Sequence, residues 1–265
     1  MSDTVLLDVD ERGVATLTLN RPDVRNAFDN DLIAKITGLL AELQARTDVR
    51  VVVLTGAGTS FSSGADIHWM KAMADFSEEQ NYEDALRLAE LMATLNHLTK
   101  PTVGRINGHA FGGGVGLVCC CDIAIAASEA LFCLSEVRLG LVPAVISPYV
   151  IDAVGPRNAR RFFLSAEPMS ARKARRVGLV HEVAKTGKLD VAVEDQVAML
   201  LKGGPSALRE SKELVHTVSG HSFTADLALK KRTAEIIAQM RVSNEGQEGL
   251  KAFLQKRPPR WCKKP

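Results

Sequence analysis

The sequence lacks an excess of charge of either sign. Its 33 lysine and arginine residues are balanced by 31 aspartate and glutamate residues, which leaves a net charge of +2. Because a protein that binds the phosphate backbone of a nucleic acid needs a basic surface, this balance does not support a nucleic-acid partner. The sequence also lacks an apolar stretch long enough to span a bilayer, and its first residues lack the features of a secretion signal. We therefore expect a cytoplasmic protein with neither a nucleic acid nor a membrane as partner.

Cysteine and histidine do not show the spacing of a metal centre. The chain has five cysteines and six histidines. Cys119, Cys120 and Cys121 are consecutive, and on a helix they would point in different directions. The histidines show no ligand spacing. We therefore predict reduced thiols, no disulfide framework and no metal site.

Three catalytic or nucleotide-binding motifs are also missing. No Gly-Lys-Ser or Gly-Lys-Thr ends a phosphate-binding loop. Gly56 and Gly58 follow an expected strand, as in a dinucleotide-binding fingerprint, but Phe61 stands where the third glycine is required. The Gly-x-Ser-x-Gly turn of many serine hydrolases is absent. These absences disfavour a phosphate-loop enzyme, a nicotinamide-dependent oxidoreductase and a serine hydrolase of that type.

The chain does contain an alternation of strand and helix patterns. Short apolar and β-branched runs predict strands at residues 4–8, 13–20, 51–55, 101–107, 122–127 and 131–134. The run Val-Val-Val-Leu-Thr at 51–55 suits a strand that is buried on both faces. Helical periodicity predicts one helix capped by Asn30 and another over residues 82–98. Together these patterns predict an α/β fold whose loops gather at one end of a sheet, where chemistry is commonly found.

The last third of the chain has a helical pattern and a separate apolar surface. Four apolar positions there exceed what one small segment can bury on itself: Leu227, Ile236, Ile237 and Met240. We therefore expect residues 1–204 to form a catalytic core. Residues 205–265 are expected to form a helical region that packs on the core, on another subunit, or on both.

A glycine run and a lone acid carry the functional argument. Gly112, Gly113 and Gly114 open an apolar helical run, and Glu136 lies 22 residues after the third glycine. Glycines at a helix N-terminus can present backbone N–H groups to a developing oxyanion, and an acid can carry a proton. Taken separately, the glycines also suit tight turns, and the acid suits a solvated helix start.

Segments in a fixed order resemble the crotonase (enoyl-CoA hydratase/isomerase) superfamily over essentially the whole chain. They lie at residues 20–28, 52–67, 106–122, 136–143, 171–180 and 248–259. The resemblance implies a core of repeated ββα units wound as a superhelix, with a C-terminal helical region that forms a homotrimer or a hexamer of two trimers. It also implies an acyl-CoA thioester substrate, in which CoA is part of the substrate and no separate cofactor is needed.

The resemblance assigns roles to individual residues. In that family two backbone N–H groups form an oxyanion hole for the thioester enolate, and by motif position these belong to Ala65 and Gly113. Glu136 matches a glutamate that acts as general acid and base. Other matched positions are expected to contact the CoA or acyl part of the substrate: Arg25, Ala27, Ser63, Asp66, Ile67, Gly116, Phe253 and Lys256. The last two match positions that often reach the CoA of a neighbouring subunit.

Gly116 occupies the position at which many hydratases of the superfamily carry a first glutamate. A single remaining acid leaves an enoyl-CoA isomerase open as an alternative, beside a non-catalytic binding protein of the same fold. The segments around Gly116 and Glu136 nevertheless resemble hydratases of glutaconyl-type CoA esters, which act in leucine and acyclic terpenoid breakdown. The resemblance therefore favours hydration of 3-methylglutaconyl- or isohexenylglutaconyl-CoA.

Such a substrate makes two further demands on the site. We expect Gly116 to leave open space beside the β carbon, which would suit a branched acyl chain. A carboxylate at the far end of that chain would require a cation or a hydrogen-bond donor. The sequence offers four candidates without ranking them: Arg138, His68, Ser147 and Tyr149.

Overall fold

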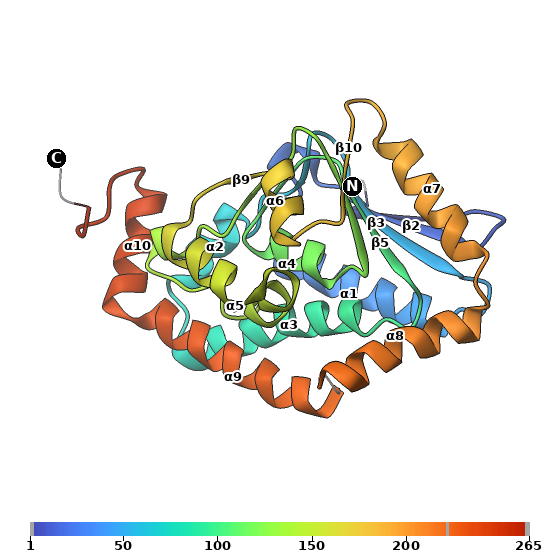
Figure 1. Cartoon of the computed structure of the whole chain (residues 1–265). Helices are drawn as coiled ribbons and strands as arrows, with labels where there is room; N and C mark the ends of the chain where they lie inside the picture. Colours follow the sequence, from blue (N-terminus) through green and yellow to red (C-terminus); the bar gives the residue numbers. More distant parts are fainter. Residues whose placement is uncertain (1–2, 221–222, 263–265) are drawn as a thin grey trace.

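Two β-sheets form the framework of the computed structural model, which describes residues 3–220 and 223–262 (Figure 1). The larger sheet has the order β1-β2-β3-β5-β7-β10, in which β1 and β2 are antiparallel and the remaining neighbours are parallel. Its strands are β1 (Val5–Val9), β2 (Val14–Leu19), β3 (Val51–Gly56), β5 (Thr102–Ile106), β7 (Ile123–Ala127) and β10 (Glu182–Ala184). The bounds of the first five strands lie close to those expected from the sequence, whereas β10 was not expected. The predicted α/β class is confirmed.

A smaller sheet is built from short strands, most of which follow a strand of the larger sheet along the chain. It has the order β4-β6-β8-β9. Its strands are β4 (Ser60–Ser62), β6 (His109–Phe111), β8 (Leu131–Cys133) and β9 (Met169–Ser170). The successions β3-β4, β5-β6 and β7-β8 are the repeated strand–strand units that the resemblance implied. Of the four short strands, only β8 was expected from the sequence.

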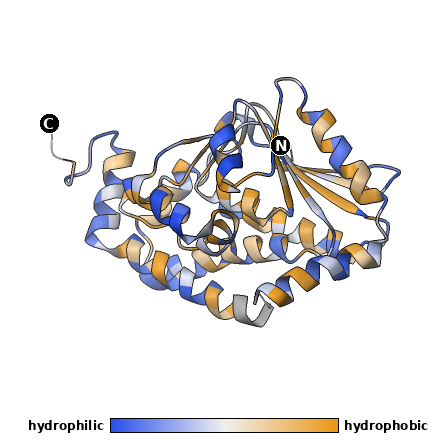
Figure 2. Cartoon of the chain, in the orientation of Figure 1, coloured by the Kyte–Doolittle hydropathy of each residue, from blue (hydrophilic) through white to orange (hydrophobic). Residues whose placement is uncertain are grey.

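The larger sheet is covered on both faces. Val52 and Leu54 of β3 belong to the main apolar core, whereas Val51 and Val53 pack with α7 (Leu189–Leu201) on the other face. A strand buried on both faces requires a continuous apolar run, and the run at 51–55 provides it. Figure 2 shows the strands of the larger sheet, toward the right of the view, coloured mostly as hydrophobic.

Two long helices pack on the core face, and both begin differently from the prediction. In α1 (Asn30–Ala45) the cap is Asp29, whose side chain accepts a hydrogen bond from the Leu32 N–H at 2.8 Å. The expected cap, Asn30, is instead the first helical residue. Helix α3 (Glu78–Asn96) begins four residues before the expected start, because Ser77 and Gln80 form a reciprocal capping box.

Six further helices, two of them short 3-10 helices, lie between the strands and the C-terminal region in the sequence or connect the strands. They are η1 (Pro22–Val24), α2 (Ile67–Met73), α4 (Gly113–Cys120), η2 (Glu136–Leu139), α5 (Ser147–Ser165) and α6 (Ala171–Val177). Helix α5 is interrupted at Gly155, whose φ of 75° bends the chain before Pro156. The five cysteines form no disulfide.

The C-terminal helices divide into two that pack on the core and one that is exposed. Helix α9 (Phe223–Val242) lies along α3, and α10 (Asn244–Leu254) packs against α2 and η2 (Figure 1). Helix α8 (Pro205–Ser219) has no buried residue. An oligomerisation role for residues 205–265 stays a prediction, and parts of that range, including His221, lie outside the described residues. Within the described ranges, no helix combines the length and hydropathy needed to cross a membrane.

Candidate active site

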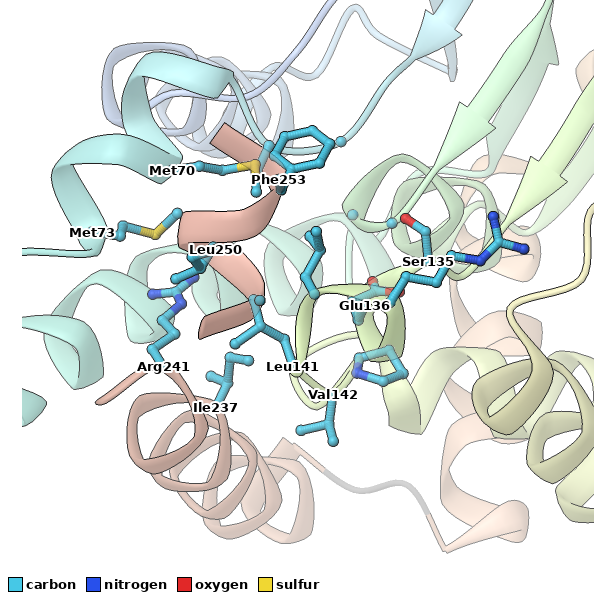
Figure 3. Close-up of a pocket in the computed structure, with 18 of the residues that line it drawn as sticks. Met70, Met73, Ser135, Glu136, Leu141, Val142, Ile237, Arg241, Leu250 and Phe253 are labelled. Atoms are coloured by element: carbon cyan, nitrogen blue, oxygen red, sulfur yellow. The ribbon is translucent and has the colours of Figure 1, made fainter. Parts of the chain in front are cut away.

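A cavity of about 430 Å³ lies between α2, η2, α9, α10 and the start of α4 (Figure 3). Its wall is mostly apolar. Among the described residues, Glu136 contributes the one carboxylate in this wall, and Arg138, Arg241 and Arg257 contribute cations. A largely apolar cavity with a few convergent polar groups is the usual form of a site for a small organic substrate.

The backbone of Ala65 is oriented by its pairing with Phe28. The Phe28 N–H donates to the Gly64 carbonyl at 2.7 Å, and the Phe28 carbonyl accepts from the Asp66 N–H at 2.8 Å. In a parallel bridge of this kind, the residue between the two bonded neighbours directs its own N–H away from the partner strand. Ala65 lines the cavity. Its N–H is therefore not used by Phe28 and is available to a substrate.

Gly113 supplies a second backbone donor in the same wall. It is the first residue of α4, so its N–H has no acceptor inside the helix. A Cβ at this position would lie 2.7 Å from Cε2 of Phe28, so only glycine allows the close approach. Phe28 thus contacts Gly113 through its ring and holds the Ala65 segment through its backbone. The two residues of the expected oxyanion hole, Ala65 and Gly113, both line the cavity.

Glu136 brings an unusual carboxyl group to the cavity. It is the first residue of η2, and its Oε2 atom is buried without a hydrogen-bond partner in the described structure. Its Oε1 atom lies 3.3 Å from the position that a Cβ would take at Gly112. Burial raises the pKa of Glu136 to about 7, against a smaller lowering by a backbone hydrogen bond. A carboxyl group with that pKa can both accept and donate a proton near neutral pH.

An unpartnered buried carboxyl group reduces the stability of a fold. Leaving such a group without a partner costs about 1–3 kcal/mol or more. Groups kept in this state are concentrated at catalytic sites, where a shifted pKa is useful. The geometry therefore agrees with the acid–base role expected for Glu136.

The other residues expected to bind substrate fall into two groups. Ser63 and Phe253 line the cavity together with Ala65, Gly113 and Glu136. Six others do not line it: Arg25, Ala27, Asp66, Ile67, Gly116 and Lys256. A CoA moiety extends well beyond a cavity of this size, so contacts of the exposed residues with CoA stay predictions.

Asp66 has a clear structural task. Its Oδ1 atom accepts a hydrogen bond from the His68 N–H at 2.8 Å and so caps α2. Its Oδ2 atom pairs with Arg21 at 3.0 Å, and the side chain is buried. Ala27 is also buried, whereas Arg25, Ile67 and Lys256 are exposed. The buried Asp66 and Ala27 can thus support the loop that contains Ala65. The exposed residues lie on the surface of the protein.

The prediction that Gly116 leaves open space is wrong. A Cβ at Gly116 would lie 2.4 Å from Cγ2 of Ile146 and 3.1 Å from Cε of Met92. The glycine is needed because α4 packs closely against these side chains, and Gly116 does not line the cavity. Ile146 itself lines the cavity at this point. The sequence could not show this packing, since Ile146 lies on a separate segment 30 residues away.

Of the four candidates for binding a distal carboxylate, only Arg138 lines the cavity. Its Nη2 donates to the Ala166 carbonyl at 2.8 Å. The Ser147 hydroxyl donates to the Ala144 carbonyl at 2.7 Å. His68 is exposed, and neither His68 nor Tyr149 lines this cavity. Sequence reasoning missed Arg241, a buried cation of the cavity, because an arginine in the last turn of a helix has the pattern of a surface residue.

Comparison with known proteins gives one consistent result. Residues 10–264 match the family model described as enoyl-CoA hydratase/isomerase. A crystal structure of an enoyl-CoA hydratase from Shewanella pealeana is 42% identical, with a TM-score of 0.80, covering 98% of this chain and 96% of that one. One from Mycobacterium avium is 34% identical, with a TM-score of 0.85 and coverages of 98% and 100%. The 2,3-dehydroadipyl-CoA hydratase of Escherichia coli K12 is 32% identical over 94% of this chain and 95% of its own length.

Proposed function

The chain belongs to the enoyl-CoA hydratase/isomerase family and is an enoyl-CoA hydratase-type enzyme, and we propose that it hydrates a branched 2-enoyl-CoA of glutaconyl type. The substrate would be 3-methylglutaconyl- or isohexenylglutaconyl-CoA, and the reaction would be reversible. One observation carries the proposed chemistry: the buried, unpartnered Oε2 of Glu136 lies in a cavity that Ala65 and Gly113 also line.

The thioester carbonyl would bind between the N–H groups of Ala65 and Gly113. These donors polarise the carbonyl and, through conjugation, make the β carbon electrophilic. Each such donor contributes about 3–4 kcal/mol to barrier lowering in related acyl chemistry. The start of α4 adds the positive end of its dipole on the same side.

Glu136 would then move the proton. As a carboxylate it removes a proton from water, and the resulting hydroxide oxygen forms a bond to the β carbon. The electron pair of the double bond passes to the thioester oxygen as an enolate. The enolate recovers its carbonyl when the α carbon takes the proton from Glu136. One acid can thus serve both steps, and its pKa of about 7 suits both directions.

Two features support the glutaconyl-type substrate. The relative from Escherichia coli has a name that denotes an acyl chain with a carboxylate at its far end. The cavity wall of this chain contains arginines among apolar side chains, which suits an acyl chain that is apolar along its length and anionic at its tip. Leucine or acyclic terpenoid breakdown, which would supply such esters, is the proposed setting, in the cytoplasm.

Product analysis in isotopically labelled water tests this function. The substrates are 3-methylglutaconyl-CoA, crotonyl-CoA and a 3-enoyl-CoA. The proposal predicts label in a β-hydroxyl group and faster hydration of the carboxylated, branched ester than of crotonyl-CoA. A double bond that moves in the 3-enoyl-CoA, with no hydroxylated product from any ester, would mean that the enzyme is an isomerase.

A further inference from the structure

The cavity has an open end and a closed end. Phe253, which is 44% exposed, and the half-buried Arg257 belong to the exposed part of its wall, which we take as the open end. The closed end is formed by buried residues of α2, α9 and α10 (Figure 3): Met70, Met73, Ile237, Arg241 and Leu250. Because CoA is far longer than the cavity, it can leave only through the open end. We therefore expect the tip of the acyl chain to lie among the buried residues of the closed end.

Arg241 is the cation of this closed end. It lies on α9 and is 7% exposed. Its Nη1 atom donates to Oδ2 of Asp84 at 2.9 Å and is also near the Oδ1 of Asn81, at 3.4 Å. Within the described structure, its Nε and Nη2 atoms have no hydrogen-bond partner, and neither atom is fully buried. One edge of the guanidinium thus has no partner among the described residues, and Arg241 lines the cavity.

The partner of Arg241 does not require that free edge. Asp84 also accepts a hydrogen bond from Nε1 of Trp69 at 3.1 Å, and Nη2 of Arg87 lies 3.8 Å from it. Asp84 is therefore held from three sides. A guanidinium carries five N–H donors in a planar fork, so Arg241 can serve Asp84 with one nitrogen and a second carboxylate with the others.

We propose that Arg241 binds the distal carboxylate of the acyl chain and determines the preference for carboxylated over neutral enoyl-CoA esters. This inference rests on the proposed function and names the residue that selects its substrate class. The surroundings explain the selectivity. A carboxylate that reaches Arg241 exchanges water for a charge-assisted bond in an apolar enclosure, whereas a neutral chain end leaves the free edge of the guanidinium without a partner.

A purely structural role is the alternative, since the Arg241–Asp84 pair also joins α9 to α3. The two roles predict different effects of a substitution on the preference for a charged over a neutral substrate. The measurement is kcat/KM for a carboxylated 2-enoyl-CoA divided by kcat/KM for its carboxamide analogue, which has the same shape and no charge. We expect Arg241→Gln to lower this ratio about 10- to 100-fold, the range of a lost charge-assisted bond.

Asp84→Asn gives the opposite prediction. It removes the anion that competes for Arg241, so the ratio should rise, on the order of several-fold. If the pair only joins the two helices, both variants would reduce turnover of both esters by a common factor and leave the ratio unchanged. That result would overturn the proposal. If Arg241→Gln does not fold, the ratio in Asp84→Asn decides alone, with a rise supporting the proposal and an unchanged or lower ratio contradicting it.

Arg232→Gln is the matched control, because Arg232 lies on the same helix, is exposed and pairs only with Glu235 among the described residues. Its ratio should equal that of the wild type.

The proposed function can fail separately: the wild type would then hydrate neither ester. In that case calorimetry measures the affinities for the saturated carboxylated acyl-CoA and for its carboxamide. The ratio of these two affinities then replaces the ratio of kcat/KM values. Equal affinities in wild type and Arg241→Gln would contradict the role of Arg241.

Discussion

The Oε1 atom of Glu136 lies 3.3 Å from the position that a Cβ would occupy at Gly112. The acid and the glycine run, which are separate in the sequence, therefore meet at one wall of the cavity. Gly112 has a φ of 50°, a conformation that favours glycine. This residue turns the chain into α4 and leaves room for the carboxyl group at the same time.

The first prediction follows from that contact. Gly112→Ala should lower kcat several-fold, up to about ten-fold, because the new methyl group would displace the Glu136 carboxyl group by a few tenths of an ångström, and a misplacement of about 1 Å can cost about 100-fold. Gly155→Ala is the matched control: its φ of 75° gives similar backbone strain, but no atom lies within 4 Å of its Cβ position. Steady-state kinetics of both variants separate crowding from strain. Equal losses in the two would show that Glu136 does not depend on the space at Gly112.

The second prediction concerns stability against pH. The pKa of Glu136 is about 7 in the folded chain and has an ordinary value of 4.5. The folded state binds this proton more tightly than the unfolded state does. The resulting contribution to the free energy of unfolding is therefore fully present below pH 4.5 and is lost as the pH rises through about 7. The loss amounts to about 3 kcal/mol.

Glu136→Gln cannot ionise and should escape this loss. Urea unfolding at a fixed protein concentration should show the variant more stable than the wild type at pH 8, and the difference should shrink towards pH 4.5. A difference that does not change with pH would contradict the buried, proton-binding state of Glu136.

The third prediction tests the packing around Gly116. Gly116→Ala should destabilise the fold by about 1–3 kcal/mol, as overpacking in a core does, because Ile146 occupies the site of the new methyl group. Combining it with Ile146→Ala should recover part of the loss beyond additivity. Gly38→Ala, in a helix with no atom within 4 Å of its Cβ position, should be neutral or stabilising. Additive unfolding energies of the pair would refute the contact.

The fourth prediction concerns assembly. Helix α8 exposes Leu214, Val215 and Val218, the last to 78%. We propose that this face is covered in a trimer or a hexamer of two trimers. Val218→Asp should then reduce the mass measured by light scattering, whereas Val191→Asp on the exposed side of α7 should not. A wild-type protein that is a fully active monomer would contradict this assembly.

Much of the framework could be predicted from local patterns. The β-branched run at 51–55 indicates β3, because a strand buried on both faces needs apolar residues at every position. The resemblance indicated Ala65, Gly113 and Glu136 as site residues, since their motifs occur in order along the chain, and all three line one cavity. Their catalytic roles stay predictions. Short strands such as β9 could not be predicted, because two residues carry no periodicity.

The rest depends on contacts between distant segments. Gly116 suggested open space, but the side chain that fills that space comes from the segment before α5. Arg241 resembled a surface residue, and its partner Asp84 lies 157 residues earlier on α3. Neither pairing has a local signal in a single sequence. The residues around Glu136 were therefore more accessible to prediction than Arg241 and its partner.

The central claim is that Glu136 carries the proton in hydration. The most direct test is kcat for hydration of the best enoyl-CoA substrate by Glu136→Gln, in protein whose fold is verified by circular dichroism. Gln keeps the shape of the side chain but cannot exchange a proton, so turnover should fall by about 100-fold or more. A variant that hydrates the substrate at nearly the wild-type rate would contradict the account.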